Sequence, residues 1–234
     1  MTVLTDDTNY KAIADAIRAK NGTDESYKPS EMASAITALK GGGSEDGVID
    51  GSAETIDNDR VTFVRESAFY NFLSLTSVNL PNVTEIDYSA FSGCESLSKV
   101  NMPKLETVGY SAFEYCEALE SISLPAATYI DGYAFNGCTN LTDIDMPNVE
   151  TIMDNAFQDC TSLKTIYIPA TCTTIDASAS YDSPFDGCYK NGLHIYCGAS
   201  SKPDGWGTYW NATSSSGSYA DVTWGVTPEE YAAL

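Results

Sequence analysis

Apolar residues recur along residues 56–197 with a period of 22, and polar residues fill most positions between them. An Ala-Phe pair occurs once in each of five copies, a Leu follows six residues after each Phe, and a Pro follows six residues after each Leu. Cys stands three residues after the Phe in the last four copies. The aligned residues are Phe69, Phe91, Phe113, Phe135 and Phe157; Cys94, Cys116, Cys138 and Cys160; Leu75, Leu97, Leu119, Leu141 and Leu163; Pro81, Pro103, Pro125, Pro147 and Pro169. Such a repeat predicts a solenoid, in which neighbouring coils share one core.

The segments between the Leu and Pro positions alternate apolar and polar residues, which is typical of short strands. They are residues 76–80, 98–102, 120–124, 142–146 and 164–168. Each following Pro ends its strand, where the missing N–H costs least. We expect the Ala-Phe-x-x-Cys section to form a helical turn or tight bend on the opposite side. The sequence therefore predicts about six stacked coils with parallel strands on one face.

The first and last copies depart from the pattern. Phe72 takes the place of Cys and Asp59 the place of Pro in the first copy, and Phe157 to Phe185 is a step of 28 residues in the last. Irregular end coils are typical of a capped solenoid, because these coils lack a neighbour on one side. We therefore assign residues 47–197 to the solenoid and residues 198–234 to a C-terminal cap.

Residues 1–40 show a helical periodicity instead. Tyr10, Ile13 and Ile17 fall on one face of a first helix, and Met32, Ile36 and Leu39 form a second apolar stripe. A hairpin of this length is near the lower limit for independent folding, so we expect it to serve in attachment or oligomerisation. The Gly-rich residues 41–46 form the expected linker. The predicted fold class is therefore α+β: a helical hairpin, a repeat solenoid and a cap.

The charge distribution excludes some classes of partner. The 234-residue chain has a formal net charge of −21, while residues 1–40 hold five basic and six acidic residues and are nearly neutral. So acidic a chain argues against nucleic acid, because phosphate binding needs a basic face. No stretch approaches the roughly 18 apolar residues of a spanning helix. The start of the chain lacks the basic and apolar regions of a signal peptide. We expect no nucleic-acid partner and no membrane insertion.

Two columns of outward strand positions are the candidate binding residues. Their side chains vary in size and charge between copies, whereas the inward positions hardly change. Solenoids present such columns as one continuous surface. The candidate binding residues are Asn79, Asn101, Ser123, Asp145 and Tyr167 in one column and Ser77, Lys99, Ser121, Asp143 and Thr165 in the other. Unconstrained surface varies in the same way, so this alternative stays open.

The remaining chemistry-bearing residues favour structural roles. The cysteines lack Cys-x-x-Cys spacing, so we expect buried thiols and no metal site, with a disulfide between Cys172 and Cys197 as the open alternative. His194 is the one histidine and is expected to be a strand residue. Asp143 and Asp145 flank one strand residue, and a solvated face is favoured over a calcium site. No nucleophile, zinc-protease or phosphate-loop motif occurs. We expect no enzyme activity and no cofactor.

The repeat resembles the treponeme-type, or BspA-like, leucine-rich repeats, whose unit reads much like residues 81–102, PNVTEIDYSAFSGCESLSKVNM. The similarity covers about residues 56–197, and residues 195–206 with Trp210 and Trp224 look like the closing segment of such proteins. The family occurs mainly in bacterial surface proteins, in their phages and in some protists, usually in adhesion. The resemblance therefore implies a curved solenoid with a binding role.

Residues 10–23 (YKAIADAIRAKNGT) and 29–36 (PSEMASAI) resemble a short module that opens many phage and prophage virion proteins. This resemblance implies a phage virion protein, of the tail, a fibre or the particle surface. In that role residues 5–40 contact other virion proteins, the chain forms a homo-oligomer, and the solenoid contacts a host surface protein or glycan. The alternative is a bacterial cell-surface adhesin of the BspA-like type.

Overall fold

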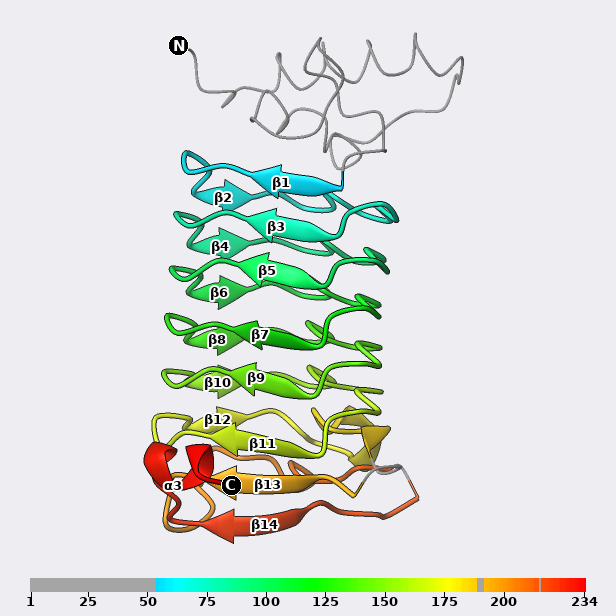
Figure 1. Ribbon diagram of the computed structural model, residues 1–234. Coiled ribbons are helices and arrows are strands. Elements are labelled where there is room, and N and C mark those ends of the chain that lie inside the picture. The colour runs from blue at the N-terminus through cyan, green and yellow to red at the C-terminus, as the bar shows by residue number, and fades with distance from the viewer. Residues whose placement is uncertain (1–53, 189–191, 215) are drawn as a thin grey trace, which may run out of the picture.

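The computed structural model describes residues 54–188, 192–214 and 216–234, which form a stack of coils (Figure 1). Each regular coil contributes one strand to each of two parallel ladders. Ladder A consists of β1 (Thr55–Asp57), β3 (Ser77–Asn79), β5 (Lys99–Asn101), β7 (Ser121–Ser123), β9 (Asp143–Asp145), β11 (Thr165–Ile168), β13 (His194–Cys197) and β14 (Asp221–Trp224). Ladder B consists of β2 (Phe63–Val64), β4 (Glu85–Ile86), β6 (Thr107–Val108), β8 (Tyr129–Ile130), β10 (Thr151–Ile152) and β12 (Thr174–Ile175).

The strand register follows the sequence repeat. In ladder A, Ser77 pairs with Lys99 and Asn79 with Asn101, a step of 22 residues that leaves every side chain facing the same way as its neighbour. Ladder A is hydrogen-bonded in three sections, and β5 lies beside β7 and β9 beside β11 where the sections meet. The predicted parallel-strand solenoid of about six 22-residue coils is confirmed.

Ladder B corrects the prediction of a single strand per coil. Its strands are two residues long, too short to show an alternation of apolar and polar residues. In each of them the second residue is buried and the first faces outward, as for Ile86 and Glu85. The helical turn or bend expected around each Ala-Phe-x-x-Cys section is a series of turns that follows ladder B.

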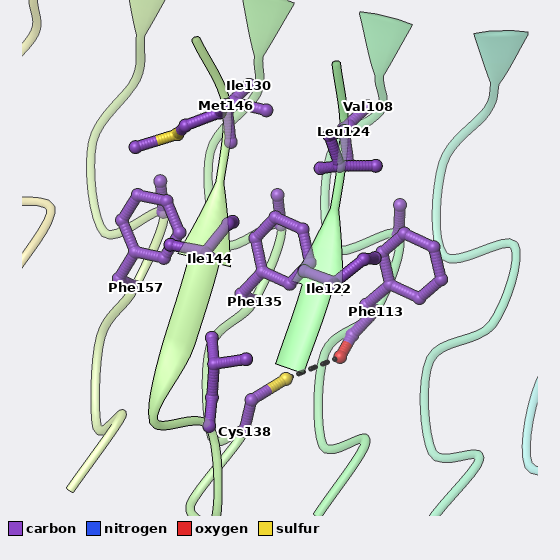
Figure 2. Close-up of a cluster of buried hydrophobic side chains, with 14 of the residues drawn as sticks. Val108, Phe113, Ile122, Leu124, Ile130, Phe135, Cys138, Ile144, Met146 and Phe157 are labelled. Atoms are coloured by element: carbon purple, nitrogen blue, oxygen red, sulfur yellow. Dashed lines mark hydrogen bonds between the residues drawn. The ribbon is translucent and has the colours of Figure 1, made fainter. Parts of the chain in front are cut away.

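The core is a set of columns that run along the stack. The phenylalanines of successive coils are fully buried, and the ring of Phe113 stacks on Phe91 and Phe135 with centroids 5.4 Å apart in both pairs. Ile122 and Ile144 from ladder A and Ile130 from ladder B close around these rings (Figure 2). Because each ring packs between two copies of itself, no coil can bury its own core alone.

The cysteine positions form a second buried column, as predicted. The thiol of Cys138 donates a hydrogen bond to the carbonyl oxygen of Phe113 in the preceding coil at 3.1 Å (Figure 2). Cys94, Cys116 and Cys160 make the same bond to the Phe 25 residues before them. A cysteine side chain is small enough to be buried in this column, and its S–H supplies a weak donor that alanine lacks.

The C-terminal segment extends ladder A instead of only covering its end. β14 pairs in parallel with β13, which pairs with β11. Beneath them the indole rings of Trp206, Trp210 and Trp224 contact one another with centroids 4.6–5.7 Å apart. The short helix α3 (Pro228–Ala232) follows β14, and its capping box at Thr227 and Glu230 satisfies the first-turn N–H groups.

The expected helical hairpin of residues 1–40 and linker of residues 41–46 lie outside the described residues. In the part of the chain that the structure describes, no helix is both long enough and apolar enough to span a membrane.

Candidate functional site

The ten candidate binding residues lie on one surface, the outward side of ladder A. Ser121 pairs with Asp143 and Ser123 with Asp145, so the two columns predicted from sequence run in register across the strands. The register adds residues that the sequence analysis left out: Thr55 and Asp57 before the columns, and His194, Tyr196, Asp221 and Thr223 after them. The inward side chains between the two columns, such as Ile122 and Ile144, are buried in the core.

Side-chain hydrogen bonds tie neighbouring coils together within this surface. Asn79 Nδ2 donates to Asp57 Oδ1 at 2.7 Å, and Asn101 Nδ2 donates to Asn79 Oδ1 at 2.6 Å. Further along the column, the hydroxyl of Ser123 donates to Asp145 Oδ2 at 2.9 Å. Bonds of this kind hold each side chain in one rotamer, which lowers the entropy cost of presenting it to a partner.

The C-terminal end of the surface is aromatic and partly covered. The ring of Tyr231 on α3 lies 5.4 Å from the rings of both Tyr167 and Tyr196, and its hydroxyl donates to Thr165 Oγ1 at 3.2 Å. Tyr167 in turn donates its hydroxyl to the Val226 carbonyl at 3.0 Å. Tyr167 and Thr165 are therefore packed against α3, while the candidate residues from Ser77 to Asp145 are left uncovered by it. The five-residue helix carries no repeat signal that could have predicted this contact.

The electrostatic character of the surface is mildly acidic. Lys99 is the one basic side chain at these outward positions of the described strands, against Asp57, Asp143, Asp145 and Asp221. Burial raises the pKa of Tyr167, and the nearby Glu229 adds to the shift. Burial likewise raises the pKa of Tyr231. Both phenols are therefore neutral hydrogen-bonding groups at physiological pH.

The groups that chemistry most often uses are engaged in the fold. His194 lies on β13 as expected, with Nε2 2.8 Å from the Thr223 hydroxyl and its ring stacked on Tyr196. All seven cysteines are free and buried, so Cys172 and Cys197 form no disulfide in this structure. Burial raises the pKa of the Cys172 and Cys197 thiols to about 12, which leaves them protonated and weakly nucleophilic.

No group of three or more His, Cys, Asp or Glu side chains in the described ranges is placed to hold a metal ion. Asp143 and Asp145 point outward from β9 on either side of Ile144. The surface can thus offer hydrogen bonds, carboxylates and aromatic faces to a partner, which are the means of binding and not of a reaction.

The architecture defines the class of protein: a leucine-rich-repeat solenoid with a parallel ladder of short strands. The model of the BspA type leucine rich repeat region, in six copies, matches residues 62–189. Because this span is more than half of the chain, the chain belongs to the BspA type leucine-rich-repeat family.

Solved structures support the same assignment. A T. pallidum leucine-rich-repeat protein is 25% identical with a TM-score of 0.54, and the match covers 67% of this chain and 78% of that one. A leucine-rich-repeat protein from Bacteroides ovatus is 24% identical with a TM-score of 0.46, over 59% of this chain and 47% of that one. A comparison with curated protein sequences found no match.

Proposed function

We propose that the chain is a non-enzymatic binding module of a bacterial surface, whose partner binds on the outward side of ladder A. The observation that carries this proposal is the uncovered surface from Ser77 to Asp145, in which rotamers are fixed by bonds between coils. Membership of the BspA type family supports the proposal, since adhesion is the role implied by the resemblance. The partner is a surface protein or glycan that hydrogen-bonds to amide, hydroxyl and carboxylate groups.

An array of glycans and purified surface proteins, probed with the labelled full chain, tests the proposal. Asn101→Trp places a bulky ring in the middle of the outward side of ladder A, while Thr107→Trp places the same ring on ladder B. We expect Asn101→Trp to abolish the signal on the bound array members and Thr107→Trp to keep it. Equal binding by both variants, or no specific binding by the parent chain, overturns the proposal.

A role in a phage virion is the second candidate. It is favoured by the resemblance of residues 10–23 and 29–36 to virion proteins, although these residues lie outside the described ranges and the comparisons lend the role no support. In this role residues 5–40 attach the chain to the particle or to further copies of itself. Light scattering of residues 1–234 and 47–234 tests it. A defined oligomer for the longer chain and a monomer for the shorter favour the virion role, and two monomers count against self-assembly through residues 5–40.

A further inference from the structure

A second surface follows ladder B, on the turns that come after β4, β6 and β8. The rings of Tyr88 and Tyr110 stack there with centroids 5.5 Å apart, and the ring of Tyr133 lies 5.4 Å from Tyr110 at a tilt. Tyr88 and Tyr110 are 48% and 39% exposed, so this row is not part of the core. The row crosses three coils and leads towards Asp154.

The row of tyrosines ends where the regular stack is interrupted. Asn155 N–H donates to the carbonyl of Asp182 at 3.3 Å, in the coil whose step is 28 residues instead of 22. This longer coil brings Asp182 beside Asp154, and Asp176 approaches from the end of β12. Tyr110, Tyr133, Asp154, Asp176 and Asp182 are called the tyrosine–aspartate patch below.

A buried and incompletely satisfied side chain points into this patch. Asn155 is 2% exposed, and its Nδ2 donates to the Tyr133 hydroxyl at 2.9 Å and lies 3.5 Å from Asp154 Oδ2. Its Oδ1 has no hydrogen-bond partner among the described residues. A buried acceptor without a donor costs free energy, and native structures hold few of them. The amide therefore retains an acceptor for an N–H group that enters the patch.

The charges in the patch are repulsive. Burial raises the pKa of Asp154, and Asp176 and Asp182 raise it further. Asp154 in turn raises the pKa of Tyr110 and Tyr133. Every charged side chain that shifts these three groups is a carboxylate or another tyrosine. Like charges held together in this way destabilise the folded chain, and a cation relieves the repulsion.

We propose that the tyrosine–aspartate patch binds arginine or lysine side chains of a partner polypeptide. Guanidinium and ammonium groups supply N–H donors for the carboxylates and the Asn155 acceptor, and their charge is attracted to tyrosine ring faces. The row from Tyr88 to Asp154 extends over four coils, so a short extended segment with several basic residues fits it better than a single small cation. No group of ligands suited to a metal ion occurs there or elsewhere in the described ranges. The patch is separate from the outward side of ladder A.

Calorimetric titration of the full chain tests the inference with two probes: a peptide of alternating arginine and glycine, and the same peptide with neutral citrulline for arginine. At about 50 mM salt, where screening is weak, we expect only the arginine peptide to bind. Asp154→Asn with Asp176→Asn should weaken binding about tenfold or more, and Tyr110→Leu about fivefold through loss of a ring face. The double Asn variant removes repulsion, so it is expected to fold, and thermal unfolding checks this.

The matched control removes the same charge from the other surface. Asp143→Asn with Asp145→Asn should change the affinity for the arginine peptide by less than about twofold, because these residues lie on ladder A. Equal weakening by both double variants means general attraction to a chain of charge −21 and overturns the inference. Equal binding of the citrulline peptide, or no binding, also overturns it. Since the array experiment tests Asn101 on ladder A, the two proposals fail independently.

Discussion

Replacing Phe113 by Ala tests the core that joins the coils. The ring is fully buried and stacks on Phe91 and Phe135 at 5.4 Å on both sides. Phe→Ala substitutions in a core cost about 3–5 kcal/mol of unfolding free energy, and each lost aromatic pair is worth about 0.5–1.5 kcal/mol beyond area burial. Because two pairs are lost and fixed neighbours limit collapse of the cavity, we expect about 4–5 kcal/mol for Phe113→Ala.

Urea unfolding followed by circular dichroism measures this loss, and two variants calibrate it. Lys99→Ala removes an exposed side chain and should change stability by less than about 0.5 kcal/mol. Phe185→Ala removes a ring that stacks on Phe157 alone among the described rings, at 5.8 Å, so it should cost about 1 kcal/mol less than Phe113→Ala. If Phe113→Ala and Lys99→Ala cost the same, the assignment of inward and outward positions is wrong.

Three further predictions concern other parts of the molecule. Burial raises the pKa of the Cys138 thiol to about 12, so a thiol reagent at pH 8 should label it only as fast as the chain unfolds, and labelling at the rate of a free thiol contradicts this. Tyr231→Ala removes two ring contacts on ladder A and should cost about 1–2 kcal/mol in urea unfolding, whereas exposed Tyr219→Ala should cost less than about 0.5 kcal/mol. Because the pKa of Asp154 is raised above its ordinary 3.8, the folded chain takes up this proton first, so stability should rise as the pH falls from neutral towards that value. Asp154→Asn should flatten this pH dependence, and an unchanged slope contradicts the assignment.

The repeat allowed most of the fold to be predicted. Columns such as Phe69 to Phe157 recur because each coil buries the same residue against its neighbour, so one physical requirement is written five times in the sequence. Ladder B left no such signal, since two residues per strand are too few to show a period. The partner surface on ladder A was predictable only as a set of outward positions, because their alternation with buried residues fixes direction and not chemistry.

The features that the sequence analysis missed depend on contacts between distant segments. Tyr231 meets Tyr167 over 64 positions of chain through a helix of five residues, and no periodicity encodes that meeting. The tyrosine–aspartate patch arises because the longer last coil brings Asp182 beside Asp154. Tyr88, Tyr110 and Tyr133 were expected on turns and edges, but their stacking follows from the coil spacing and not from local sequence.

The bonds between coils give this molecule a natural unit of change in length. The hydrogen bond from Asn101 to Asn79 joins residues 22 apart, and the Cys138 thiol reaches the carbonyl 25 residues before it. Duplication or deletion of 22 residues within the regular coils preserves every such pair, whereas a change of 21 or 23 shifts the inward side chains outward. Tandem duplication of one 66-base-pair segment of the gene thus lengthens the stack by about 4.8 Å while the core stays in register.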